Sequence, residues 1–438
     1  MAESDSISNL TFPSEFIYNK HQLIQAAITN EYDEEVSCSN LSPQGKTLDF
    51  EITGEANVYR DLSNSYLQVV CRVVKDTSVL GADDAVAPVN NLLHSLFSDC
   101  EISVCGTRVN DKESHYPYRA VIEQLLSSSP DVLKTRAKLH GWELDTNPAL
   151  MDSIIVEETE NAQPNPAFLE RRKQIALSKE ITLIGRPHAD LFHQDLDIPA
   201  NCRINVKLTR TSNEFVLMAA DNAKFKVEIL SASLFVRSKE VAPEIIEVHR
   251  EQLKLENLHI PLTQCSIKTF QIGANLTSAS FASIFPDKLP KRIVVGLVRQ
   301  DRVTGKYSLN PFKFENFDLK SVFVTVGGKS IPAVPLSMNY GNQDYARAYI
   351  NTLAALNLDT ANKGIELNPE LWANAYNLYA FKLVPGAIQG SIESTRLRAS
   401  VNLSFEFSAK TTAPIEVFVY SETGRNLEIT ATNKAFTV

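Results

Sequence analysis

The chain has 438 residues, of which 44% are hydrophobic and 22% are charged, and its formal net charge is −9. These values are typical of a globular protein with two or three domains, each large enough to bury its own core. An acidic chain without an arginine-rich arm is poorly suited to coating nucleic acid, so we expect weak, non-specific DNA binding at most.

Membrane insertion and secretion are also disfavoured by the sequence. No run approaches the roughly 20 apolar residues of a transmembrane helix, and the first residues resemble no signal peptide. Six cysteines are thinly spread and form no C-x-x-C motif: Cys38, Cys71, Cys100, Cys105, Cys202 and Cys265. Their spacing favours buried free thiols in an intracellular protein over a disulfide framework.

The first half of the chain predicts a β-rich domain behind a polar arm. Residues 1–45 are polar and rich in turn-forming residues, so we expect an extended arm there. Alternating apolar and polar residues then predict strands. These strands span residues 47–54, 65–76, 100–109, 180–186, 202–211 and 224–237. Helical spacing appears only at 118–126 and 165–177, on either side of an acidic surface excursion.

The second half repeats this plan after a helix predicted at 243–257, which begins at Pro243 and which we interpret as a connector. Strands are predicted at 259–273, 292–300, 321–328, 376–385, 397–410, 413–423 and 426–433, and a helix is predicted at 343–357. Each half therefore offers seven or eight strands, with helices confined to excursions. This pattern predicts an all-β protein of two tandem eight-stranded antiparallel jelly-rolls.

Two segments far apart in the chain resemble each other. The segment from Pro88 contains an apolar stretch, a strand, a turn at Gly106, a second short strand and a helix ending near Leu126. The segment 311–356 has the same order, with its turn at Gly328. A repeat of this length is too long for a solenoid unit and indicates two whole β-domains. We divide the chain into an arm (1–45), a first jelly-roll (46–241), a connector (242–257) and a second jelly-roll (258–438).

The densest polar cluster lies at residues 186–199. This segment contains His188, Asp190, His193, Asp195 and Asp197. Histidine and aspartate can bind a metal ion, but H-x4-H is not a recognised zinc spacing, and residues five apart on an extended segment point to opposite faces. We therefore favour a polar loop that hydrogen-bonds its own backbone. We predict no metal site, no cofactor site and no catalytic residue.

The remaining motifs also argue against an enzyme. No G-x-S-x-G, H-E-x-x-H or P-loop motif occurs. The basic run 170–173 could form part of a nuclear import signal or a phosphate site, but a solvated helix face is the favoured interpretation.

The second half is rich in aromatic residues: Phe312, Phe314, Phe317, Phe323, Tyr345, Tyr349, Trp372, Tyr376, Tyr379 and Phe381. We expect them mainly to fill a core, and any surplus on the surface would favour contacts with partners.

Several segments taken together resemble a known family. The segment 183–218 reads LIGRPHADLFHQDLDIPANCRINVKLTRTSNEFVLM, and the segment 224–249 reads KFKVEILSASLFVRSKEVAPEIIEVH. Both are similar to major capsid proteins of Polinton/Maverick elements and adintoviruses. The resemblance continues through VAPVNNLLHSLFSDCEISVCGTRV in the first half and LNPFKFENFDLKSVFVTVGGKSIPAVPL in the second, and runs from about residue 47 to the end. It fades in the arm.

The resemblance implies the double jelly-roll fold of hexon-like capsid proteins. It also implies a homotrimer that contacts neighbouring capsomers and a penton or minor capsid protein, in a virion assembled in the nucleus or cytoplasm of a host cell around double-stranded DNA. Residues 127–165 and 328–375 are the candidates for its outer loops. Two alternatives remain open, namely a host-domesticated descendant of a capsid protein and a tandem jelly-roll that binds carbohydrate.

Overall fold

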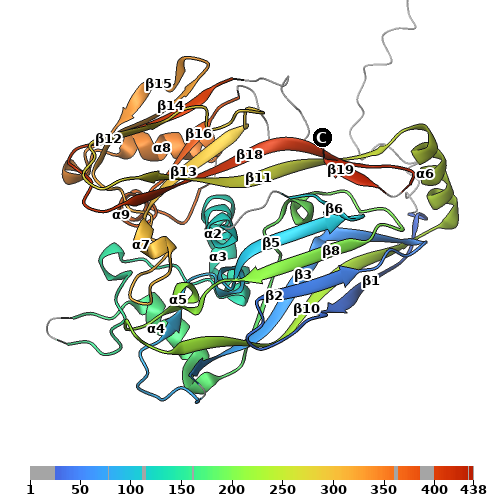
Figure 1. Cartoon of the computed structure of the whole chain (residues 1–438), viewed down its shortest axis with the longest axis horizontal. Helices are drawn as coiled ribbons and strands as arrows, with labels where there is room; N and C mark the ends of the chain where they lie inside the picture. The colour runs from blue at the N-terminus through green and yellow to red at the C-terminus, as the bar shows by residue number, and fades with distance from the viewer. Residues whose placement is uncertain are drawn as a thin grey trace, which may run out of the picture.

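The computed structural model of the chain describes residues 25–76, 78–110, 115–159, 162–359, 364–384, 399–432 and 434–437. The first 24 residues of the predicted arm, and residues 397–398 of a predicted strand, lie outside the described residues. Within them the chain consists of antiparallel sheets, with its helices in the connections (Figure 1). The predicted all-β class is therefore confirmed.

Two four-stranded sheets form the first jelly-roll. One has the order β1-β10-β3-β7 and the other the order β2-β8-β5-β6. The strands of the first sheet are β1 (Ile28–Ser37), β10 (Phe225–Val241), β3 (Val58–Lys75) and β7 (Ile181–Gly185). Those of the second sheet are β2 (Thr47–Ile52), β8 (Ile204–Arg210), β5 (Phe97–Val104) and β6 (Thr107–Arg108). Two further short strands, β4 (Ala87–Pro88) and β9 (Leu217–Met218), pair with each other.

The second jelly-roll is built in the same way. Its sheets have the orders β11-β18-β13-β16 and β12-β17-β14-β15, and β19 adds to the edge of β18. The strands of the first sheet are β11 (Leu258–Ile272), β18 (Ile415–Ile429), β13 (Arg292–Arg299), β16 (Leu378–Lys382) and β19 (Ala435–Thr437). Those of the second sheet are β12 (Ser278–Phe281), β17 (Val401–Phe407), β14 (Leu319–Val326) and β15 (Lys329–Ser337).

The two strand orders are equivalent when each jelly-roll is read in chain order. The first, eighth, third and sixth principal strands form one sheet of each jelly-roll, and the second, seventh, fourth and fifth form the other. This equivalence confirms two tandem eight-stranded antiparallel jelly-rolls. The position of the domain boundaries stays a prediction.

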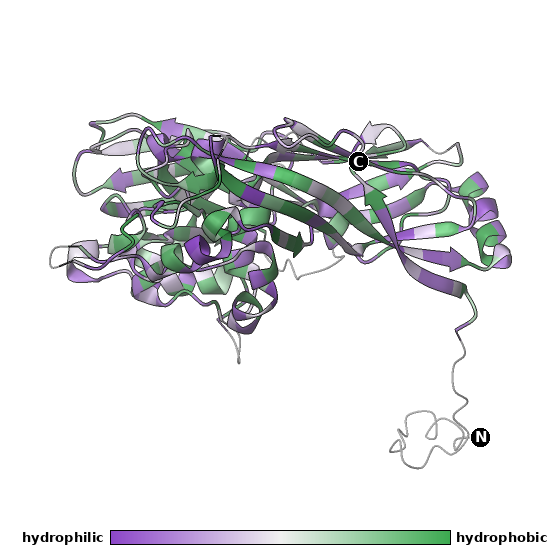
Figure 2. Cartoon of the chain, turned by 90° about the horizontal axis from the view of Figure 1, so that it is seen from below, coloured by the Kyte–Doolittle hydropathy of each residue, from purple (hydrophilic) through white to green (hydrophobic). Residues whose placement is uncertain are grey.

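Alternation of side chains explains why the strands pack as two-layered barrels. In β3, Leu67, Val69, Cys71 and Val73 are almost fully buried, while the residues between them are partly exposed. The same alternation continues along β10, which pairs with β3 in antiparallel register. Figure 2 shows hydrophilic and hydrophobic residues in turn along the long strands. Successive side chains of a strand point to opposite faces, so one face of each sheet fills the core.

The repeated glycine turns are equivalent in the two jelly-rolls. Gly106 has φ +81° between β5 and β6, and Gly328 has φ +83° between β14 and β15. The residue before each glycine, Cys105 or Gly327, also has a positive φ. Two successive positive φ values are those of a type I′ hairpin turn, whose twist matches the flanking strands. The predicted repeat is thus confirmed at its turns.

The helices lie between strands. They are α1 (Leu92–Ser95), α2 (Tyr116–Ser127), α3 (Pro130–Lys134), η2 (Arg136–His140), η3 (Pro148–Leu150), α4 (Pro166–Ile175), η4 (Ala176–Ser178), η5 (Asp190–His193), α5 (Asn213–Val216), α6 (Pro243–Leu255), α7 (Gln300–Val303), η6 (Tyr340–Asn342), α8 (Ala346–Ala355) and α9 (Pro369–Asn374). The predicted helix at 243–257 is α6, which begins at Pro243. No helix of the described residues is long and apolar enough to cross a membrane.

Three sequence-based predictions differ from the structure. Residues 28–37, assigned to the arm, form strand β1 along the edge of a sheet; its side chains are mostly exposed, so its sequence lacks an apolar alternation. Strand β12 was not predicted, because its four residues are mostly small and exposed. The two strands predicted at 413–423 and 426–433 form one strand, β18, because β11 pairs with it continuously past Gly424.

Candidate functional site

Helix α2 lies between the two jelly-rolls and contacts both (Figure 1). Tyr118 of this helix stacks on Phe418 of β18, with 4.0 Å between the ring centroids. Its hydroxyl donates a hydrogen bond to the carbonyl oxygen of Pro311, at 3.2 Å. Aromatic contacts of this kind stabilise beyond the area they bury. One face of α2 therefore belongs to a core shared by both jelly-rolls.

A buried ionic network continues from α2 into the second jelly-roll. Arg119 Nη2 donates to Asp190 Oδ1 of η5 at 2.6 Å, and both side chains are almost fully buried. The same carboxylate oxygen accepts a hydrogen bond from the backbone N–H of Cys265 in β11, at 3.1 Å. Arg119 Nη1 also donates to the carbonyl oxygen of Cys265, at 3.3 Å. The pair therefore joins α2 and η5 to the backbone of the second jelly-roll.

Glu123, one turn after Arg119, accepts hydrogen bonds from both jelly-rolls. Its Oε1 accepts from Arg119 Nε at 2.9 Å and from the hydroxyl of Tyr420 in β18 at 3.2 Å. Its Oε2 lies 2.6 Å from His188 Nδ1. Burial alone would raise the pKa of the Glu123 carboxyl, but Arg119 and His188 outweigh it and lower that pKa below its usual range. Glu123 is therefore an anion in the folded protein.

These residues line a cleft of about 280 Å³ between the jelly-rolls, which we call the joint cleft. The first jelly-roll contributes Arg119, Glu123, His188 and His193, and the second contributes Thr263, Cys265, Lys291, Arg292, Lys382, Tyr420 and Glu422. An ion pair joins Arg292 to Glu422 on its far wall.

A second ionic contact, which we call the Arg302 anchor, lies apart from the joint cleft. Arg302 of α7 is almost fully buried and forms two parallel bonds to Asp152, Nη1 to Oδ1 at 2.5 Å and Nη2 to Oδ2 at 2.8 Å. Asp152 Oδ1 also accepts from the backbone N–H of Asn310 at 2.9 Å. Burial would raise the pKa of the Asp152 carboxyl, but Arg302 more than compensates and lowers it. Paired bonds of this geometry fix orientation as well as distance.

The buried residue Asp145 is connected to the Arg302 anchor through Asn310, which hydrogen-bonds both Asp145 and Asp152. Its carboxylate accepts from Arg171 Nη2 at 3.1 Å, from Asn165 Nδ2 at 2.7 Å and from Asn310 Nδ2 at 3.1 Å. The prediction of a solvated face for the run 170–173 is thus wrong for Arg171, which points inward to this carboxylate and is 1% exposed. The prediction that the excursion 127–165 lies outside is likewise wrong for Asp145, which is buried.

The polar cluster of residues 186–199 divides between three environments. His188 and His193 come together at the joint cleft, because Asp190–His193 form a 3-10 turn that reverses the chain. The inference that residues five apart point to opposite faces is wrong here, since it assumed an extended segment. Asp190 binds Arg119, and Asp197 binds Lys239 Nζ at 3.0 Å. Asp195 is exposed.

Two composition-based predictions can be compared with burial. Phe312, Phe314, Trp372, Tyr376, Tyr379 and Phe381 are almost fully buried, and the other four of the ten aromatic residues are partly buried. Core filling is therefore confirmed, and these ten residues leave no surplus for a surface platform. All six cysteines are free thiols, but only three of them, Cys71, Cys100 and Cys202, are buried.

Sequence reasoning missed the residues that join the jelly-rolls. One signal was present, because Arg119 and Glu123 are spaced four apart on a helix that is otherwise apolar. Charged residues on an apolar helix face are expected to have buried partners. Asp152 and Arg302 carried no such signal, since they are 150 residues apart. Asp152 lies outside any helix or strand, and Arg302 lies in a helix of only four residues.

No protein-family model matches the chain. The chain is 21% identical over 407 residues to an uncharacterized protein of Caenorhabditis elegans, a match that covers 88% of this chain and 92% of that protein. This identity alone does not assign a family.

Several solved structures have the same fold. A chain of the Sputnik virophage, solved by cryo-EM, matches with a TM-score of 0.63 and 9% identity, over 98% of this chain and 92% of that one. A chain of the quasi-atomic model of the PBCV-1 virus capsid matches with a TM-score of 0.56 and 10% identity, over 96% and 99%. The Faustovirus major capsid protein matches with a TM-score of 0.53 and 12% identity, over 94% and 92%. The fold is therefore that of double jelly-roll major capsid proteins.

Proposed function

We propose that this chain is a major capsid protein that forms homotrimeric, pseudo-hexagonal capsomers of an icosahedral shell around double-stranded DNA. The observation that carries the proposal is the tandem of two complete, equivalent jelly-rolls, which matches a virophage chain over 98% of the length. A shared fold alone is a weak argument for function. The collinear sequence segments that resemble Polinton/Maverick capsid proteins add to it, and they favour that group of elements.

The mechanism follows from geometry. A trimer of a chain with two similar jelly-rolls places six barrels around one axis, and such a unit can tile a hexagonal lattice. The contact between subunits is heterologous and closes after three steps, so it forms a ring. A stable trimer of this kind should bury well over about 2,000 Å² in total.

The joint between the jelly-rolls supports this mechanism. Tiling requires that the two barrels of a subunit keep one relative orientation. The Arg302–Asp152 pair joins the two jelly-rolls, and Arg119 and Asp190 both hydrogen-bond the backbone of Cys265 in β11. Another orientation would take these partners away from buried charged and polar groups, so it is disfavoured. In this proposal the joint fixes the shape of the subunit before assembly, and it catalyses no reaction.

Lattice partners follow from the same proposal. The capsomers would contact each other and a penton or minor capsid protein, and they would reside in the virion after assembly in the nucleus or cytoplasm. Parts of the segments 127–165 and 328–375 would form the outer loops. The net charge of −9 fits a shell that does not itself condense the genome.

Size-exclusion chromatography with light scattering tests the proposal. The expected mass is that of three 48.7 kDa chains, or that of a large particle. A stable monomer at micromolar concentration would contradict the proposed capsomer.

A second candidate is a host-domesticated capsid descendant, and the nematode relative is the observation that favours it. Particles purified from the source cells distinguish the two. Nuclease-protected DNA inside them supports the capsid, whereas trimers without particles or packaged DNA support domestication. The carbohydrate-binding alternative needs an exposed aromatic platform, and none of the ten aromatic residues named above in the second half of the chain is exposed.

A further inference from the structure

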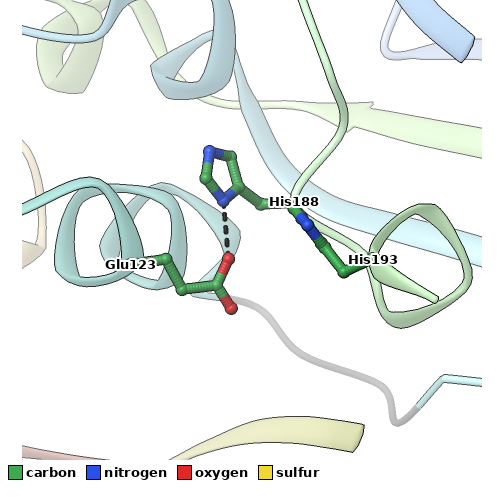
Figure 3. A group of neighbouring side chains, drawn as sticks. All are labelled: Glu123, His188 and His193. Carbon is green, nitrogen blue, oxygen red and sulfur yellow. Dashed lines mark hydrogen bonds and ion pairs between the residues drawn. The ribbon is translucent and has the colours of Figure 1, made fainter. Parts of the chain in front are cut away.

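Three potential metal ligands meet on one wall of the joint cleft. Glu123 comes from α2, His188 follows β7, and His193 ends η5. One ligand atom of each lies within 4.8 Å of the others. Figure 3 shows the carboxylate of Glu123 beside the ring of His188, with His193 to the right of both. The sequence favoured a polar loop because this segment offered only two histidines at an unusual spacing, and the third group comes from a helix 65 residues earlier.

The separations are close to those required by a small tetrahedral ion. Zinc binds histidine nitrogen and carboxylate oxygen at about 2.0–2.2 Å, so two of its ligand atoms stand roughly 3.3 Å apart. Glu123 Oε2 and His188 Nδ1, at 2.6 Å, need to separate only slightly. His193 is exposed to solvent, so its ring can turn toward the other two without displacing a packed neighbour.

The hydrogen bonds of Glu123 leave its Oε2 in a position to bind a cation. Its Oε1 is held by Arg119 at 2.9 Å and by Tyr420 at 3.2 Å, which orients the carboxylate and leaves Oε2 toward the histidines. Asp190 lies 2.6 Å from Arg119 and balances that positive charge. The hydrogen bond between His188 and Glu123 occupies the place of the ion, and the proton on Nδ1 would leave or move to Nε2 on binding.

We propose that Glu123, His188 and His193 bind one divalent transition-metal ion of the Zn²⁺ class. Two imidazoles and one carboxylate favour zinc or a similar metal over Ca²⁺ and Mg²⁺, which prefer sites made of oxygen ligands alone. The fourth position opens into the joint cleft and takes a water molecule. The ion ties α2 to η5, the two elements that contact β11 through Arg119 and Asp190. This inference is independent of the proposed capsid function.

Calorimetric titration of the full, untagged chain with Zn²⁺, after treatment with a chelator, tests the site. We expect binding of one ion per chain, and His193→Ala should weaken it at least about tenfold. His193 is exposed, so its replacement should leave the fold intact. The matched control is His259→Ala, because this histidine is also exposed and lies 3.4 Å from a carboxylate, that of Glu428.

A second readout uses Co²⁺, whose visible absorption reports tetrahedral binding. The wild type and His259→Ala should show this absorption, and His193→Ala should lose it. The proposal is overturned if the wild type binds no ion, if His193→Ala binds as tightly as the wild type, or if the control loses binding to the same degree. In each of these cases Glu123 and His188 form a hydrogen bond and no metal site.

Discussion

At the scale of single residues, the joint depends on charges that were removed from water and then paired. Arg119 and Arg302 are each 3% exposed in their side chains, and each binds a carboxylate of the first jelly-roll. Desolvation of such groups costs several kcal/mol, and pairing with good geometry is needed to offset it. These ion pairs therefore contribute more to the relative orientation of the packed segments than to the net free energy of unfolding.

Asp152→Ala tests the Arg302 anchor. The substitution removes the two parallel bonds from the buried Arg302 guanidinium and leaves it the Glu315 carboxylate at 2.9 Å, so the free energy of unfolding should fall by about 2 kcal/mol. Urea denaturation measures this loss. Glu406→Ala is the control, because its pair with Lys320 is exposed and its loss should leave the free energy of unfolding nearly unchanged. Equal effects of the two substitutions would contradict a special role for the anchor.

Two buried histidines predict a pH dependence. Burial lowers the pKa of His140 to about 3, with further lowering by His188 and Arg136, and burial also holds the pKa of His94 well below 6.5. Both are neutral in the folded protein, whereas the unfolded chain takes up protons below about pH 6.5. The stability that they contribute is complete above about pH 6.5 and decreases as the pH falls toward their folded pKa values.

The slope of stability against pH measures this effect. Between about pH 6.5 and 5 each histidine should contribute up to about 1.4 kcal/mol per pH unit. His140→Gln should remove one such contribution while retaining a donor for Asn91 Oδ1, which accepts from His140 Nδ1 at 2.8 Å. An unchanged slope in this variant would show that His140 does not stay neutral in the folded protein.

At the scale of elements, the two jelly-rolls share the same glycine turn. Gly106 and Gly328 both have positive φ values, which residues with a side chain rarely adopt. A Cβ at Gly328 would meet no atom within 4 Å, so conformational strain alone opposes a side chain there.

Gly328→Ala should therefore destabilise the protein by about 1 kcal/mol through backbone strain. Gly364→Ala is the matched control, since its Cβ also meets nothing within 4 Å and no positive φ constrains it. Thermal denaturation of the two variants measures the difference. The same denaturation midpoint for both variants would contradict the positive φ of Gly328 in the type I′ turn.

The sequence predicted the elements better than their contacts. Alternation in strands such as 65–76 and the helical spacing at 118–126 are local patterns, and local patterns suffice where one face is buried. Strand β1 was not predicted, because an exposed edge strand shows little alternation of apolar and polar residues. The contacts between distant segments could not be predicted, because no local pattern in the sequence shows which segments pack together. Examples are the pairs Asp152–Arg302 and Glu123–His188.

At the scale of the whole molecule, the chain combines two equivalent jelly-rolls with unequal loops. The connection from the turn glycine to the next α-helix is longer in the second jelly-roll, from Gly328 to Ala346, than in the first, from Gly106 to Tyr116. Equal barrels alone could give a ring with sixfold symmetry. In the proposed trimer, unequal loops would reduce this to threefold symmetry.

Electron microscopy of the purified assembly tests this account most directly. Averaged views along the symmetry axis should show six barrel-like densities around a threefold axis, with two alternating kinds of outer loop. A monomer, a dimer, or a ring whose subunits place their barrels in any arrangement other than this pseudo-hexagon would contradict it.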